Sequence, residues 1–144
     1  MSFLGATSNA KLDTCHPDLQ RLIRAVAEKV NFTVICGHRN EAEQTEAVAT
    51  GRSKTPWPKS RHNTFPSEAV DVWPYALGIG LNWKDVAAGA RLMGYIQATA
   101  DSMGIEIELG MDWDMDWRSA GQDPGENFYD GPHVQLKRKA NGKV

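Results

Sequence analysis

The chain has 144 residues, of which 41% are apolar and 24% charged, and this predicts one globular domain over residues 1–144 rather than a disordered chain. A formal net charge of −2 argues against nucleic acid as a partner, because such binding needs a basic surface. The N-terminus lacks the pattern of a signal peptide, and no stretch reaches the roughly 20 apolar residues that span a bilayer, so we expect synthesis in the cytoplasm and no membrane partner.

The first half of the chain alternates helix and strand before a long loop. Residues 16–30 carry apolar side chains at helical spacing, with Pro17 suited to the first turn. Residues 32–36 form a β-branched run that predicts a strand, and residues 41–50 predict a more polar helix. Residues 51–68 contain three prolines and many small polar residues, which is typical of a long loop that is either functional or disordered.

The second half of the chain predicts strands over 69–73, 105–109 and 133–136, and a helix over about 83–103. We expect the first of these strands to end at Pro74, residues 110–131 to be irregular, and the basic tail from Lys137 to fray. Strands that are adjacent late in the chain favour an α+β class, with a small mixed or antiparallel sheet and helices packed on one side.

Potential metal ligands stand where the two long loops run into strands. His62 and Asp71 flank the end of the first loop, and His133 follows the second loop, three residues after Asp130. Imidazole nitrogens and carboxylate oxygens are ligands of zinc, and a catalytic zinc site uses three protein ligands and leaves a fourth position for water. His62, Asp71 and His133 would supply that set, and Asp130 would be the general base that carries a proton to a leaving amine.

Each of these residues also has an ordinary structural explanation. A histidine is more often exposed or hydrogen-bonded in a core than bound to a metal. Asp71 is the stronger indication, because it interrupts an apolar run and a buried aspartate needs a partner, although it could face solvent from a half-exposed strand. Cys15 and Cys36 belong to no CxxC pair, so we expect no thiolate zinc site and interpret Cys36 as a small buried apolar residue.

These residues, in this order, resemble the M15 family of zinc peptidases, which includes VanY-type D,D-carboxypeptidases and the L-alanyl-D-glutamate endopeptidases of phage endolysins. The motifs that carry the resemblance are Ser60-x-His62, Ala69-x-Asp71 and Asp130-x-x-His133. The resemblance spans most of the chain, from Gly37 to Leu136. It implies a fold like that of the Hedgehog and D,D-peptidase proteins, a zinc ion (Zn2+) on His62, Asp71 and His133, and Asp130 as the base.

The resemblance also implies substrate contacts. Arg39 would stabilise the developing oxyanion or hold a substrate carboxylate, although the residue alone is more typical of a surface charge or a structural ion pair. The other substrate-binding residues that it implies are Ser60, Gln44, Trp113 and Asp112. By itself the aspartate-rich stretch 110–117 suggests calcium, but the spacing of an EF-hand loop is absent, and we expect it to form a wall of the cleft.

The chain departs from the family pattern at three points. His62 and Asp71 are nine positions apart, where seven is usual, Ser67 stands in place of the usual glycine, and the base is Asp130 rather than glutamate. These changes are compatible with the same ligands, because ligand geometry depends on where the loops and strands end. They leave the subfamily and the substrate pocket open, with a leaning toward the phage enzymes.

The leading hypothesis is therefore a monomeric phage endolysin that cuts L-alanyl–D-glutamate bonds in bacterial peptidoglycan peptides, made in the host cytoplasm and acting on the wall after release. A D-alanyl-D-alanine carboxypeptidase or dipeptidase on the same fold is the nearest alternative. A non-haem iron oxygenase would also use two histidines and a carboxylate, but with closer spacing along the chain. A non-catalytic wall-binding phage structural protein remains the non-enzymatic alternative.

Overall fold

The computed structural model describes residues 3–123, 126 and 128–144. Its elements, in chain order, are α1 (Ala6–Leu12), α2 (Pro17–Ala27), β1 (Phe32–Cys36), α3 (Glu41–Ala49), the 3-10 helix η1 (Arg61–Asn63), β2 (Ala69–Ala76), β3 (Gly80–Leu81), α4 (Val86–Met103), β4 (Ile107–Leu109) and β5 (His133–Leu136). Over the described ranges, no helix combines the length and the hydrophobicity needed to cross a membrane.

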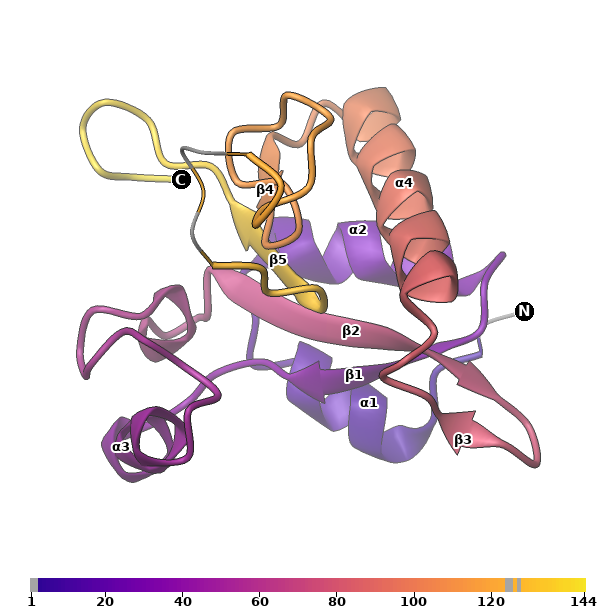
Figure 1. The fold of residues 1–144 in the computed structure, drawn as a ribbon, viewed down its shortest axis with the longest axis horizontal. Coiled ribbons are helices and arrows are strands. Elements are labelled where there is room, and N and C mark those ends of the chain that lie inside the picture. The colour runs from indigo at the N-terminus through magenta and orange to yellow at the C-terminus, as the bar shows by residue number, and fades with distance from the viewer. Residues whose placement is uncertain (1–2, 124–125, 127) are drawn as a thin grey trace.

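The strands form one antiparallel sheet in the order β1-β2-β5-β4, with β3 paired to the far end of β2 (Figure 1). The predicted α+β class is confirmed, and of the two sheet types expected the sheet is antiparallel. The final strand, β5, lies between β2 and β4, so that residues far apart in the sequence meet at the centre of the sheet. In that pairing Asp71 of β2 lies directly opposite His133 of β5.

One face of the sheet carries the hydrophobic core. Val70 and Val72 of β2 and Val134 of β5 are fully buried in it, as the alternation of a strand predicts. Helices α2 and α4 contact each other over this face, and α1 contributes Leu12. Residues between these apolar positions, Asp71 among them, point to the opposite face of the sheet. The packed core therefore presents a polar row of side chains on the other side of the central strands.

Helix α1 protects the free edge of the sheet. Strand β1 is an edge strand, and the backbone N–H of Val34 donates to Oγ of Ser8 at 3.0 Å. That hydroxyl also lies 3.1 Å from Oγ1 of Thr33. A side chain thus satisfies a backbone donor that an edge strand would otherwise leave open to pairing with another chain. Helix α1 was not predicted from the sequence.

Strand β2 runs through Pro74 to Ala76, so the prediction that it ends at Pro74 is wrong. Proline has no N–H to give to a ladder, and it is tolerated only where no partner needs that donor. Val72 donates to Pro132 O on the β5 side, and two residues later the same side is free because β5 pairs only with Ala69–Asp71. The strand therefore continues past Pro74 along β1 at no cost in hydrogen bonds.

Candidate functional site

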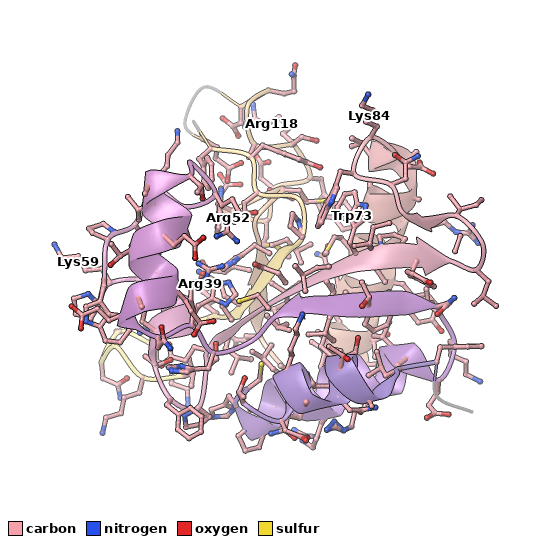
Figure 2. The ribbon with its side chains drawn as sticks, turned by 90° about the horizontal axis from the view of Figure 1, so that it is seen from below. Arg39, Arg52, Lys59, Trp73, Lys84 and Arg118 are labelled. Carbon is pink, nitrogen blue, oxygen red and sulfur yellow. The ribbon has the colours of Figure 1, made fainter. Side chains whose placement is uncertain are left out.

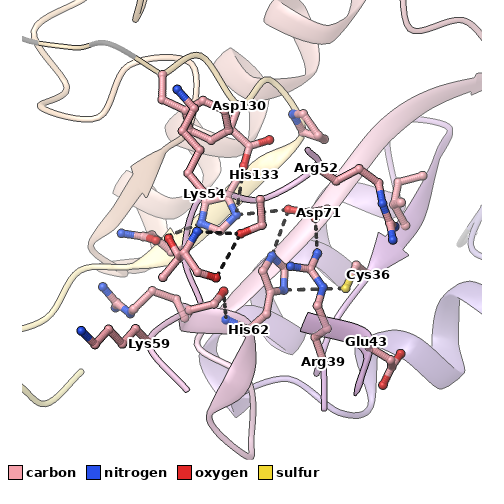
Figure 3. A pocket seen from close by; sticks show the side chains of 18 of the residues that line it. Cys36, Arg39, Glu43, Arg52, Lys54, Lys59, His62, Asp71, Asp130 and His133 are labelled. Atoms are coloured by element: carbon pink, nitrogen blue, oxygen red, sulfur yellow. Dashed lines mark hydrogen bonds and ion pairs between the residues drawn. The ribbon is translucent and has the colours of Figure 1, made fainter. Parts of the chain in front are cut away.

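The polar face of the sheet opens into a cleft of about 750 Å³ between α3, the loop 51–60 and the segment 128–133 (Figures 2 and 3). The predicted site residues among those that line it are Arg39, Ser60, His62, Asp71, Trp113, Asp130 and His133. Gln44 and Asp112 are not among its lining residues. Most of the residues singled out in the sequence therefore come together in one place, although they lie on four separate parts of the chain.

Both predicted histidine ligands meet the same oxygen of Asp71. His62 Nε2 lies 3.2 Å from Asp71 Oδ1, and His133 Nδ1 lies 3.2 Å from that same atom. Asp71 and His133 are brought together by the pairing of β2 with β5. His62 arrives from the single turn of η1, whose N-cap Ser60 accepts the N–H of His62 at 3.2 Å. A short capped turn and a two-strand register thus fix all three side chains.

Hydrogen bonds on the far side of each ring decide which nitrogen faces Asp71. His62 Nδ1 lies 2.7 Å from the carbonyl oxygen of Gly37, and His133 Nε2 lies 2.9 Å from Oε1 of Gln135. Gln135 is oriented in turn because its Nε2 donates to Glu108. Carbonyl oxygens only accept hydrogen bonds, so these two ring nitrogens carry the protons. In the neutral rings, His62 Nε2 and His133 Nδ1 then turn bare lone pairs toward a carboxylate oxygen.

This arrangement fits a divalent cation. Two lone pairs and a carboxylate oxygen that converge without a proton or a cation between them would repel one another. Zinc bonds of about 2.0–2.1 Å at tetrahedral angles put neighbouring ligand atoms about 3.3–3.4 Å apart. The two distances of 3.2 Å to Asp71 Oδ1 are close to that spacing, whereas the two histidine nitrogens lie further apart than that and would move closer on a bound ion. A histidine held through its other nitrogen by a protein acceptor is also the usual arrangement around a bound metal.

The pKa values of His62 and Asp71 also show that positive charge is favoured at this place. Burial favours neutral His62, but the charge of Asp71 and hydrogen bonds to Asp71 and Cys36 outweigh it and raise the pKa of His62 to about 10. Burial also favours neutral Asp71, but the charge of His62 and the hydrogen bonds from His133 and His62 hold the pKa of Asp71 well below its usual range. In the metal-free protein a proton on His62 therefore supplies the charge that a metal ion would bring.

Asp130 lies next to this group, with its Oδ2 3.8 Å from His133 Nδ1. Burial and, after it, the negative charge of Asp71 raise the pKa of Asp130 above its usual value. Gly110 holds the backbone of both Asp130 and His133, because its N–H donates to His133 O and its carbonyl oxygen accepts the N–H of Asp130. A Cβ at Gly110 would lie 2.8 Å from Cβ of His133, so only glycine fits between the two residues.

Arg39 reaches the other oxygen of Asp71, with Nη2 3.7 Å from Oδ2, and donates from Nη1 to Gln44 Oε1 at 3.0 Å. Gln44 is completely buried and also donates to Ser53 and to the carbonyl of Thr55. It therefore ties Arg39 to the loop that forms one wall of the cleft. All these contacts of Gln44 are internal to the protein, and its direct contact with a substrate stays a prediction.

Trp113 lines the opposite wall of the cleft, whereas the neighbouring Asp112 does not line it. The ring of Trp113 packs against His133 with 5.3 Å between centroids, and its Nε1 donates to the carbonyl of Phe128. Asp112 instead accepts the backbone N–H groups of Asp116 and Trp117 and shapes its own loop. Trp113 therefore forms part of the wall of the site, and substrate binding by Trp113 and by Asp112 stays a prediction.

Cys36 and Gln135 belong to the site but were not predicted from the sequence. Cys36 was interpreted as a buried apolar residue, yet it is half-buried in the cleft, with Sγ 3.8 Å from His62 Nδ1. A β-bulge between Val34 and Cys36 turns it to the polar face, and no sequence signal marked that bulge. Gln135 could have been found, because it lies two residues after His133 on the same strand and so on the same face.

Cys36 also offers an alternative donor, because the ligand atoms of Cys36, His62 and Asp71 all lie within 4.8 Å of one another, and this group does not include His133. The contact of Cys36 is with His62 Nδ1, which already faces the carbonyl of Gly37. The nitrogen left to a metal, Nε2, faces Asp71. The orientation of the ring thus favours His133 over Cys36 as the third donor.

Comparisons with known proteins agree with this geometry. The family model described as phage L-alanyl-D-glutamate peptidase matches residues 1–137. The crystal structure of the Serratia marcescens L-Ala D-Glu endopeptidase ChiX is similar, with a TM-score of 0.71 and 32% sequence identity. The similarity covers 94% of this chain and 91% of that one. No match was found among curated protein sequences.

Proposed function

The chain belongs to the phage L-alanyl-D-glutamate peptidase family, and we propose that it is an endolysin that uses zinc to hydrolyse the bond between L-alanine and D-glutamate in peptidoglycan peptides. The observation that carries the zinc dependence is the convergence of His62 Nε2 and His133 Nδ1 on one oxygen of Asp71. All three donors come from one chain, so a monomer suffices. Synthesis in the host cytoplasm and action on the wall after release belong to the same proposal.

His62, Asp71 and His133 would hold the metal, and their outer hydrogen bonds to Gly37 and Gln135 keep the donor atoms turned inward. A zinc ion bound there would lower the pKa of a water molecule to about 7 and polarise the peptide carbonyl. Asp71 carries a full negative charge, which leaves a bound dication with a net positive charge toward the substrate. The cleft of about 750 Å³ around these residues has room for a peptide rather than a single amino acid.

Asp130 is the proton carrier in this proposal. The attacking water must lose a proton, and the amine of D-glutamate must gain one before it leaves. The pKa of Asp130 is raised by burial, so its carboxylate accepts a proton more readily than an exposed aspartate does. Its place beside His133, on the wall formed by residues 128–133, lets it serve both steps without moving out of the cleft.

Arg39 is the electrophilic partner. Its guanidinium borders Asp71 and lines the cleft, and Gln44 holds it there from behind. Negative charge that develops on the carbonyl oxygen during attack would be stabilised by a fixed cation at this point. A fixed cation needs less reorganisation energy than water molecules that must turn toward the charge. Trp113, packed on His133, would shield that side of the reacting bond from solvent.

A D,D-carboxypeptidase or dipeptidase is the second candidate, since the same donors and base would serve it. Purified, zinc-loaded protein incubated with peptidoglycan distinguishes the two when the products are identified by mass spectrometry. The proposal expects new C-terminal alanine and new N-terminal glutamate, and loss of both products with a chelator. Release of free D-alanine would favour the carboxypeptidase, and the absence of any new terminus in the presence of zinc would exclude both.

A further inference from the structure

The loop between α3 and η1 brings positive charge to the cleft. Arg52, Lys54 and Lys59 all line it. Arg39 and Arg61, which also line the cleft, are already paired with carboxylates of the protein. Within residues 3–123, 126 and 128–144, no carboxylate forms an ion pair with any of the three loop cations. The loop therefore offers charge that the protein itself does not neutralise.

Lys54 differs from the other two cations in where its ammonium lies. Its Nζ lies 4.8 Å from the centre of the Phe128 ring, on the opposite wall of the cleft. Figure 3 shows the side chain running across the cleft toward the segment that carries Asp130. Arg52 is engaged with Oγ1 of Thr50 at 3.1 Å. Figure 2 shows Lys59 extending outward past α3.

The contact with Phe128 positions Lys54 without satisfying its charge. A cation over a half-buried aromatic ring gains little free energy, and the ring brings no negative charge. The ammonium keeps hydrogen-bond donors for another acceptor. The ammonium is thus held over Phe128, which precedes Asp130 by two residues. This is the side of the cleft where the base would return its proton to the leaving amine.

The substrate carries a negative charge at that place. A D-glutamate residue uses its amine in the bond to L-alanine and one carboxyl group to continue the peptide, so its second carboxyl group remains free. That carboxylate belongs to the same residue as the leaving amine and travels with it. We propose that Lys54 is a specificity-determining residue that binds the free carboxylate of this D-glutamate. The inference rests on the proposed function and names the substrate group that the cleft recognises.

Two synthetic peptides that differ only at this group provide the test. Both contain the L-alanyl–D-glutamyl bond, and the free carboxylate is replaced by a carboxamide in the second. We expect zinc-loaded wild-type protein to cut the carboxylate peptide with a kcat/KM about 10- to 100-fold higher, the range of a charge-assisted hydrogen bond. Lys54→Met should lower kcat/KM for the carboxylate peptide to that of the carboxamide peptide and leave the latter unchanged. Lys54→Arg should retain most of the preference.

The matched control is Lys29→Met, which removes one exposed lysine far from the cleft and should alter neither rate. Because Lys54 is exposed, the variant should fold, and equal zinc content checks that the metal site is intact. Wild-type protein that cuts both peptides equally, or Lys54→Met protein that keeps the wild-type preference, would overturn the assignment. Failure of wild-type protein to cut either peptide would instead overturn the proposed function, and the inference with it.

Discussion

Zinc binding should release about one proton from His62 at pH 8, because the metal replaces a proton that His62 holds in the metal-free protein, and a zinc-bound water with a pKa of about 7 should release nearly one more. That proton bridges His62 Nε2 and Asp71 Oδ1, which lie 3.2 Å apart. A metal ion needs the same lone pair, so it can enter only as the proton leaves. The exchange is a direct consequence of the geometry and does not depend on the identity of the substrate.

The magnitude follows from the pKa of His62, which is raised to about 10. At pH 8, two units below that value, about 99% of the metal-free molecules carry the proton. The number released by His62 should stay near one from pH 7 to pH 9 and fall toward one half at about pH 10. A histidine with an ordinary pKa of about 6.5 would release almost none at pH 8.

Isothermal titration with zinc in two buffers of different ionisation enthalpy measures the released protons directly. Thermal unfolding gives a second reading. The raised pKa of His62 stabilises the folded protein fully below about pH 6.5, and this stability is lost as the pH rises through about 10. The depressed pKa of Asp71 stabilises the folded protein above the ordinary aspartate pKa of 3.8, and this stability is lost in acid. The metal-free protein should therefore lose Tm between pH 6.5 and 10, and the zinc-loaded protein should not. Release of no more than about one proton at pH 8, which the zinc-bound water alone would supply, would refute the shared-proton geometry.

Three substitutions test the surroundings of the metal site. Asp130→Asn should keep zinc but lower kcat about 10²- to 10⁴-fold in the peptidoglycan digest, and full turnover would exclude Asp130 as the base. Gln135→Met frees the ring of His133 and should weaken zinc binding about 10- to 100-fold in a competition with a chelator, whereas unchanged affinity would mean that Gln135 does not orient the ring. Gly110→Ala forces a Cβ against Asp130 and His133 and should cost about 1–3 kcal/mol in the free energy of unfolding. Gly94→Ala is its control, because a Cβ there meets nothing within 4 Å and the helix should be no less stable.

Local periodicity carried much of the fold and part of the site. An apolar run interrupted by Asp71 identified the core of β2, and the alternation of side chains along a strand puts Asp71 and His133 on the face away from the core. An aspartate within an apolar strand was a sound indication of a partner, because a buried carboxylate is costly alone. Such signals need only a few neighbouring residues, which is why they could be read without the structure.

Features that depend on distant parts of the chain could not be predicted. The pairing of Asp71 with His133 joins segments 62 residues apart, and nothing local to either segment encodes that register. The bulge that turns Cys36 into the cleft depends on how β1 meets β2. The continuation of β2 past Pro74 depends on the end of β5, and the role of α1 depends on the open edge of β1. Each is decided by a tertiary partner rather than by propensity.

A crystal structure of the zinc-loaded protein tests the central claim most directly. The account predicts one zinc ion with His62 Nε2, an oxygen of Asp71 and His133 Nδ1 at about 2.0–2.2 Å, and with its remaining position open to the cleft beside Asp130. Zinc bound to Cys36 Sγ at about 2.3 Å in place of His133 would contradict it. Zinc held elsewhere, with the two histidines still hydrogen-bonded to Asp71, would contradict it as well.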